Sequence, residues 1–309
     1  MRGLYLCGKY VLMKKVLFAV FAGSALFVQA QDGPKISSAK IALNAGDLVE
    51  AKRYIDEAKA SVDALPPEAR NPKLMPKYLL YRGDVYYALF NDPSSKNIDI
   101  LNEATAAYAD LLAYEKALGK IKLAKASEEK LPLLAQAYVG LAEDFNFNQN
   151  NKPAAVSAYE KAIATRAVVG QLDTTNMSYV AYLAMETGDK AKAEQLFKKL
   201  VELEYKGIQW TALLAEDGKR YPFPDKATLD MYIQMEKASE PQRTESILVD
   251  FYIRLLFMYI EDKRPADFDA LVKLARAKFP MNDDLLKLEL QAYLDREDFN
   301  GAISTLEEA

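Results

Sequence analysis

The sequence predicts an all-α fold of about seven helical hairpins, because it contains a repeat and few helix-breaking residues. The repeat is an aromatic residue followed by two packing residues, and it recurs after 34 positions as Tyr259, Phe268 and Ala275 and then Tyr293, Ala302 and Ala309. A period of 34 residues is typical of a pair of antiparallel helices. Only 13 glycines and 13 prolines occur among the 309 residues, so long helices can form almost throughout.

Packing explains why these residue types recur. Tyr293, in the first helix of a pair, fills the space between the two helices, and Ala302, in the second helix, lets the backbones come close. Ala275 leaves room for the next pair. Phe279-Pro280 ends a second helix because proline cannot continue it. One pair cannot bury its apolar face alone, so several pairs must stack.

These residues resemble the tetratricopeptide repeat (TPR), and the chain is similar to exported bacterial TPR proteins over most of residues 35–309. The resemblance is strongest in the last two pairs. It implies an α-α superhelix, or solenoid, with a concave face lined by the first helix of each pair. It also implies a scaffold that binds proteins, of a type common in Gram-negative cell envelopes.

The expected pairs follow one another from residue 35 to the end of the chain. Their helices span 35–44 with 48–60, 76–90 with 98–118, 129–145 with 153–168, 174–186 with 190–203, 208–216 with 225–237, 246–261 with 267–278, and 283–294 with 299–309. The fifth pair is degenerate. It depends on Ala227, which lies 34 residues after Ala193, and Tyr221-Pro222-Phe223-Pro224 separates its helices. Additional residues before the sixth pair are assigned to 238–245.

Residues 1–30 have the pattern of a secretory signal peptide. Met13-Lys14-Lys15 is basic, residues 16–28 are apolar and uncharged, and Val28-Gln29-Ala30 offers small residues where a signal peptidase cuts. The alternative is a membrane anchor, but this apolar run is shorter than the ~20 residues that a spanning helix needs. We therefore expect cleavage before Gln31.

The expected mature chain, residues 31–309, is one TPR-like domain without a transmembrane segment, located in the periplasm or at the outer membrane. Met13 is an alternative start of translation. The single cysteine, Cys7, precedes the apolar run, so the lipoprotein arrangement is absent and the mature chain has no disulfide.

Composition argues against catalysis and against nucleic acid as a partner. The chain has no histidine and no G-x-x-x-x-G-K phosphate loop, so we expect no enzyme, no cofactor and no metal site. Adjacent carboxylates such as Glu143-Asp144 point apart on a helix and do not share a site. Residues 1–30 hold four of the 40 basic residues and none of the 44 acidic ones, which leaves 36 bases, 44 acids and a net charge of −8. Such a chain repels phosphate backbones.

Four residues are the candidate partner-binding residues. In the geometry that the resemblance implies, Tyr87, Tyr182, Phe257 and Gln291 lie on first helices and face the groove. Exposed aromatic residues in a groove anchor peptides well. The alternative is that these side chains pack against the next pair. Some TPR proteins clamp a terminal carboxylate with Asn and Lys here, but the matching positions hold Asp84, Tyr182, Phe257 and Gln291, so no such clamp is expected.

The last pair ends without a polar capping helix, which leaves Ile303 and Leu306 on an uncovered apolar face. Two explanations stay open: the chain is a fragment of a longer array, or this edge packs on a partner, including a second copy. The function predicted from the sequence is a non-catalytic scaffold or adaptor in the bacterial cell envelope that binds a protein or peptide. The alternatives are a factor or enzyme that handles carbohydrate or peptidoglycan, and a structural protein that self-assembles through its C-terminal edge.

Overall fold

The computed structural model describes residues 33–223 and 225–307. The predicted signal peptide and the alternative start Met13 lie outside the described residues. Within these two ranges, no helix combines the length and the apolar character that crossing a bilayer requires. The described residues form two compact units. The first comprises residues up to Asn148 and Lys161–Leu172, and the second comprises Gln149–Glu160 and the residues from Asp173 onward.

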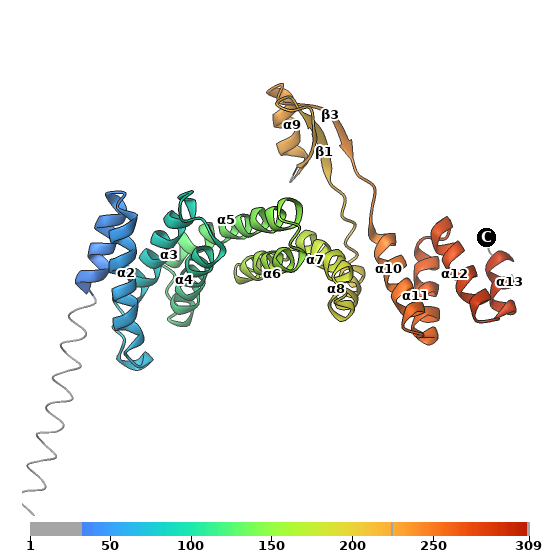
Figure 1. The fold of residues 1–309 in the computed structure, drawn as a ribbon, viewed down its shortest axis with the longest axis horizontal. Helices are drawn as coiled ribbons and strands as arrows, with labels where there is room; N and C mark the ends of the chain where they lie inside the picture. The colour runs from blue at the N-terminus through green and yellow to red at the C-terminus, as the bar shows by residue number, and fades with distance from the viewer. Residues whose placement is uncertain (1–32, 224, 308–309) are drawn as a thin grey trace, which may run out of the picture. The chain divides into compact units, whose positions relative to one another are not determined.

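The first unit consists of antiparallel helix pairs, as predicted (Figure 1). Its elements are residues 33–44, α2 (Leu48–Asp63), η1 (Pro67–Ala69), α3 (Met75–Asn91), α4 (Ile98–Ala117), α5 (Ala124–Glu143), η2 (Asp144–Asn148) and the second half of α6 (Lys152–Val168). α3 and α4 approach closely at Gly83, where a Cβ atom would lie 2.7 Å from the ring of Tyr108. Tyr108 is fully buried and donates a hydrogen bond to Asp84 at 2.7 Å. Gly83 is therefore a packing residue.

A buried carboxylate caps the start of α5. Glu115, near the end of α4, is 4% exposed, and its oxygens accept hydrogen bonds from the backbone N–H groups of Lys122, Leu123 and Ala124 at 2.6 to 3.1 Å. The first N–H groups of a helix have no partner within the helix, and the positive end of its dipole favours an anion. Glu115 thus fixes α4 to the helix that follows.

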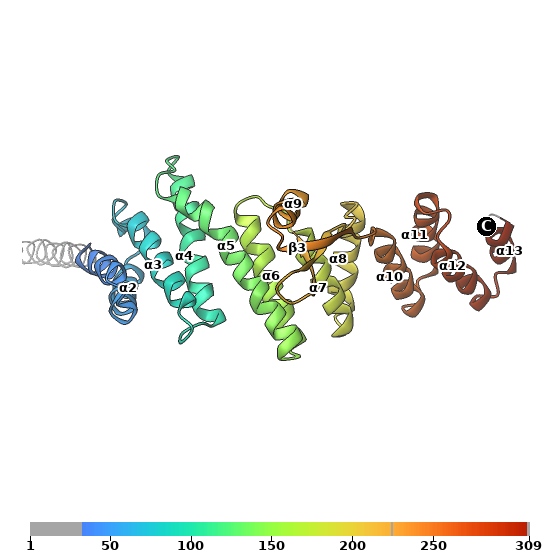
Figure 2. The same ribbon diagram turned by 90° about the horizontal axis from the view of Figure 1, so that it is seen from above.

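The second unit continues the helix pairs. Its helices are α7 (Thr174–Glu186), α8 (Lys190–Glu202), α10 (Leu248–Glu261), α11 (Pro265–Lys278), α12 (Asp283–Asp295) and α13 (Phe299–Glu307), together with the first half of α6. α7 pairs with α8, α10 with α11, and α12 with α13 (Figure 2). The small repeat residues Ala193, Ala275 and Ala302 are at most 4% exposed, and Phe268 is 1% exposed. The prediction of an array of antiparallel helical hairpins is confirmed for these helices.

A short sequence motif makes the turn between the two helices of a pair. Gly46 and Gly188 adopt positive φ angles of 78° and 81°, which cost glycine nothing and end the first helix. The aspartate that follows, Asp47 or Asp189, accepts a hydrogen bond from a backbone N–H at the start of the second helix, at 3.0 and 3.2 Å. This Gly-Asp turn fixes the antiparallel return of the chain.

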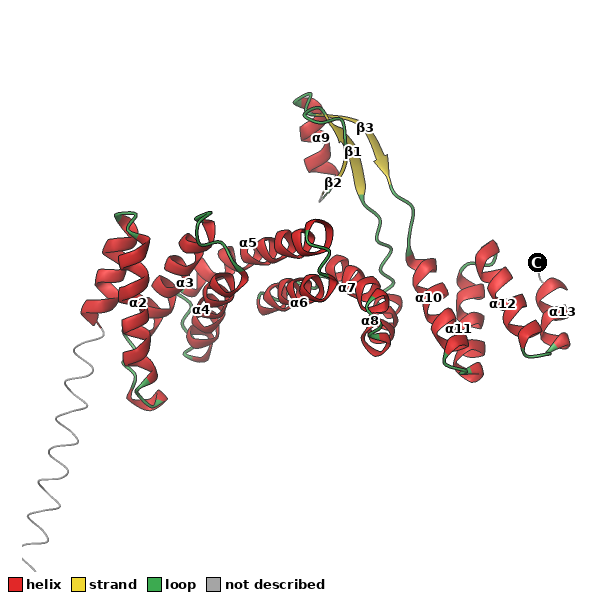
Figure 3. Ribbon diagram, in the orientation of Figure 1, coloured by secondary structure: helices red, strands yellow, loops and turns green. Residues whose placement is uncertain are grey.

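The prediction of a fifth helical pair is wrong: strands replace its first helix, and its second helix does not follow the predicted packing register. Residues 208–243 form a small sheet and one helix, made of β1 (Trp210–Leu214), β2 (Arg220–Phe223), α9 (Lys226–Gln234) and β3 (Ala238–Arg243) (Figure 3). The strand order is β2-β1-β3, with both pairings antiparallel. Ala227, expected at a packing position, is exposed on α9. The described residues therefore contain six helical pairs, not seven.

The physical reason lies in the turn between β1 and β2. Asp217-Gly218 is a strong hairpin signal: Gly218 has a φ of 67°, and Asp217 accepts a hydrogen bond from the backbone N–H of Lys219 at 2.9 Å. Pro222 lies in β2 and Pro241 in β3, and both are edge strands, where a missing N–H is tolerated. We call residues 208–243 the β insert.

The β insert has its own core. Two hydrogen-bonded segments, residues 206–209 and 244–247, connect it to the helical pairs, and we call them the stalk. The buried residues of the insert are Ala212, Phe223, Leu229 and Ala238, and they belong to a cluster separate from the core of the helical pairs. In the stalk, the N–H of Thr244 donates to the carbonyl of Gln209, and the N–H of Ile247 donates to the carbonyl of Lys206, both at 2.9 Å. The chain therefore leaves and rejoins the helical pairs along two hydrogen-bonded segments.

Candidate protein-binding surface

The four predicted partner-binding residues are divided between the two units. Tyr87 lies on α3 in the first unit, half-buried, with Lys130 Nζ 5.0 Å from the centre of its ring. Tyr182, Phe257 and Gln291 lie in the second unit, on α7, α10 and α12. Tyr87 therefore belongs to a different unit from the other three residues.

Tyr182 packs between neighbouring helix pairs. Its ring centre is 5.4 Å from that of Phe197 on α8 and 6.1 Å from that of Phe251 on α10. Its hydroxyl donates a hydrogen bond to Asp250 at 2.6 Å. Burial and this hydrogen bond raise the pKa of the Tyr182 hydroxyl above its usual value. These contacts agree with the packing role that the sequence left open as an alternative.

Phe257 and Gln291 are exposed and lie one turn from residues that line a pocket. Phe257 is 49% exposed on α10, and Ile260, three residues later, lines the pocket. Gln291 is exposed on α12 and donates a hydrogen bond to Asp295, which also lines the pocket, at 2.6 Å. Residues three or four apart on a helix are surface neighbours. Phe257 and Gln291 are therefore helical neighbours of residues that line the pocket on α10 and α12.

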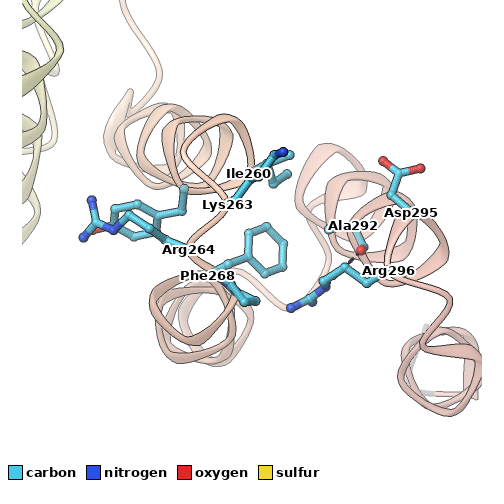
Figure 4. A pocket seen from close by; sticks show the side chains of 9 residues that line it. Ile260, Lys263, Arg264, Phe268, Ala292, Asp295 and Arg296 are labelled. Carbon is cyan, nitrogen blue, oxygen red and sulfur yellow. Dashed lines mark hydrogen bonds between the residues drawn. The ribbon is translucent and has the colours of Figure 1, made fainter.

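The pocket has a volume of about 440 Å³ and lies between the α10–α11 pair and α12 (Figure 4). We call it the α10–α12 pocket. Its lining residues are Tyr259, Ile260, Lys263, Arg264, Pro265, Phe268, Ala292, Asp295 and Arg296. Phe268 points into the space between the two pairs, and Arg296 reaches toward it from the α12 side. The wall is mainly apolar, with three cations and one carboxylate.

Two of the three cations hold neighbouring pairs together. Arg264 binds both oxygens of Glu194 on α8 at 2.9 and 3.0 Å, and its guanidinium lies 4.4 Å from the centre of the Tyr259 ring. Arg296 binds Asp269 on α11 at 2.8 Å. Glu194 and Asp269 each follow the equivalent packing residue of their helix, Ala193 and Phe268. Equivalent arginine–carboxylate ion pairs thus link α8 to the α10–α11 turn and α11 to the α12–α13 turn.

Lys263 is the third cation, and no described residue pairs with it. It has a φ of 54° in the turn after α10, at the position that Gly46 and Gly188 occupy in other pairs. The turn reads Lys263-Arg264 here instead of Gly-Asp. A left-handed conformation is unfavourable for lysine and ordinary for glycine. Glu297 occupies the matching position of the last pair with a φ of 57°, so the positive φ of Lys263 does not by itself mark the pocket in the sequence.

No group of three or more Cys, Asp or Glu side chains among residues 33–223 and 225–307 is arranged to hold a metal ion. A second hollow of about 540 Å³ lies among α11, α12 and α13, with Lys273, Arg276 and Glu289 in its wall. Arg276 and Glu289 form a largely buried ion pair at 3.3 Å. The α10–α12 pocket is the more apolar of the two and is the one next to Phe257.

Comparison with known proteins gives similarity of fold only. No family model matches the chain, and no curated protein matches it. Among solved structures, the type IV pilus biogenesis factor PilW is 12% identical, with 89% of this chain and 90% of that one covered and a TM-score of 0.35. A tetratricopeptide repeat protein from Parabacteroides merdae is 16% identical, with 90% and 91% covered and a TM-score of 0.29. With scores below 0.5, these similarities identify neither partner nor location.

Proposed function

We propose that this protein is a non-catalytic scaffold of the bacterial cell envelope that binds a protein or peptide through the first helices of its second unit. The observation that carries the proposal is Phe257, which is half exposed on α10 beside the α10–α12 pocket. An exposed aromatic residue next to an apolar hollow is a favourable anchor for a partner. The signal-peptide pattern of residues 1–30 supports export.

Affinity capture from envelope extract tests the proposal. The baits are the wild-type chain and the double variant Phe257→Ala/Gln291→Ala, and mass spectrometry is the readout. Phe147→Ala is the matched control, since Phe147 is 76% exposed in the first unit. We expect a partner that the wild type and the control retain and the double variant loses. Equal capture by all three baits, with unchanged circular dichroism, would contradict the proposed surface.

Self-association through α13 is a second candidate function. Phe299, Ile303 and Leu306 are 62%, 54% and 58% exposed and lie four and three residues apart on one face. Ile303 stands where Glu194 and Asp269 stand in the two preceding pairs, so an apolar side chain replaces the acid. An apolar edge of this kind is suited to contact with a second copy.

The mass of the protein in solution tests this second candidate. We expect the mass to rise with concentration and the Leu306→Glu variant to remain a monomer. The control is Leu274→Glu, because Leu274 is 62% exposed on a different helix, α11. A constant monomeric mass for the wild type would rule out self-association.

A further inference from the structure

We propose that the α10–α12 pocket receives an apolar side chain of the partner while Lys263 pairs with a carboxylate beside that side chain. The partner segment is thus apolar and acidic. This inference rests on the proposed function, because it names the chemistry of the partner at the same surface.

The apolar part of the proposal follows from the wall of the pocket. Ile260 and Pro265 come from the α10–α11 pair, Ala292 comes from α12, and Phe268 points between them (Figure 4). The volume of about 440 Å³ lies in the range of ~300–1,000 Å³ that is usual for ligand pockets. Removing such a wall from water by inserting an apolar side chain is favourable.

The acidic part follows from which charges in the wall are already paired. Arg264 is engaged by Glu194 and Asp267, and Arg296 is engaged by Asp269. Lys263 has no such partner among the described residues, so its ammonium group is available to a ligand. The carboxylate of Asp295 lies in the α12 wall and accepts a hydrogen bond from Gln291. A ligand carboxylate is therefore attracted at the Lys263 side and repelled at the Asp295 side.

The turn between α10 and α11 places Lys263 in the wall of the pocket. Glycine occupies the same position in two other pairs, where it adopts the positive φ without strain. Lysine adopts that conformation here, and its backbone N–H donates to the carbonyl of Ile260 at 3.1 Å. Glu297 makes the same turn in the last pair with a φ of 57°, so the turn accepts a side chain, and at Lys263 that side chain lines the pocket.

Three capped dipeptides, titrated into the isotope-labelled full chain and followed by NMR, test the proposal. N-acetyl-Leu-Asp-amide carries both features, N-acetyl-Leu-Asn-amide lacks the charge, and N-acetyl-Gly-Asp-amide lacks the apolar side chain. We expect the first to bind at least fivefold more tightly than the other two, with shifts at Ile260, Lys263 and Ala292.

Variants that change the charge of the pocket wall have opposite expected effects on the binding of the acidic probe. Lys263→Gln should remove the preference for Leu-Asp over Leu-Asn, Lys263→Arg should retain it, and Asp295→Asn should strengthen the binding of Leu-Asp. Lys287→Gln is the matched control, since Lys287 is exposed on α12 outside the pocket. Equal binding of Leu-Asp and Leu-Asn, the opposite response to the two charge changes, or no shifts in the pocket at the solubility limit of the probe would overturn the proposal.

The partner capture described above separates this inference from the proposed function. A partner that Phe257→Ala/Gln291→Ala loses but Lys263→Gln retains would leave the scaffold in place and remove the acidic segment. A partner that neither variant affects would remove the proposed surface itself.

Discussion

The helical pairs of the second unit and the β insert are stabilised in different ways. The pairs share one continuous core, in which Phe197, Phe251, Phe268 and Leu285 come from four successive helices of the pairs. The insert has a small core that shares no buried residue with it. α8 nevertheless packs against α10, although residues 203–247 lie between them in the sequence. The insert is thus an elaborated loop, and the repeat continues across it.

The largest expected effect comes from a break in the shared core. Phe251 is fully buried, and its ring centre is 5.8 Å from that of Phe197 and 6.3 Å from that of Tyr205. Phe251→Ala should lower the free energy of unfolding of the second unit by about 3–5 kcal/mol. Urea unfolding followed by circular dichroism measures this. Phe257→Ala, on the exposed face of the same helix, should cost far less, and equal costs would contradict a shared core centred on Phe251.

The corresponding change in the insert should stay local. Leu229 is 1% exposed and belongs to the small core. Leu229→Ala should destabilise the insert by about 2–4 kcal/mol. Hydrogen exchange should then accelerate in β1, β2 and β3 and stay unchanged in α8 and α10. Faster exchange in α8 or α10 would show that the two regions are coupled.

A smaller effect is expected from the ion pair that links α8 to the next pair. Arg264 and Glu194 are 33% and 18% exposed, so solvent screens the pair in part. A double-mutant cycle with Arg264→Ala and Glu194→Ala should give a measurable favourable coupling. The same cycle on Lys226 and Asp230 of α9, where both side chains are exposed, should give almost none. Equal coupling energies for the two ion pairs would show that burial does not determine the strength of the coupling.

The smallest effect is a change in acid stability. Burial raises the pKa of Glu194, but Lys198 and Arg264 outweigh it and hold that pKa below the usual value of 4.5. A lowered pKa in the folded state contributes stability above the unfolded value and loses it as the pH falls through the folded value. Glu194→Gln should therefore flatten the loss of stability below about pH 4.5. Glu202→Gln on the same helix is the control, and a slope unchanged by Glu194→Gln would count against this linkage.

The sequence predicted the helical pairs well because each carries its own local signals. The sequence pattern predicts a helix over residues 174–186, and α7 spans Thr174–Glu186. The capping residues and the buried alanines act within one pair or between adjacent pairs, so their spacing is visible in the sequence. The carboxylate of Glu115, which caps α5 from the end of α4, acts across a turn and has no such spacing.

The insert and the surface residues were harder to predict for a different reason. The 34-residue spacing from Ala193 to Ala227 is a coincidence, and the Asp217-Gly218 turn is the signal that indicates a hairpin here. Tyr182 and Phe257 occupy similar positions on first helices, yet Asp250 and Phe251 cover only Tyr182. Whether such a residue is exposed depends on the neighbouring pair, which the position alone does not reveal.

Because the two segments of the stalk are hydrogen-bonded to each other, another domain could replace the β insert at this point of the chain. Lys206 and Ile247 are hydrogen-bonded side by side, so the chain departs and returns at a single point. A fluorescent reporter whose own two ends lie close together would fit between these residues in place of the β insert. Insertions at such sites are generally well tolerated. The reporter would then follow the protein in living cells while both of its termini remained free.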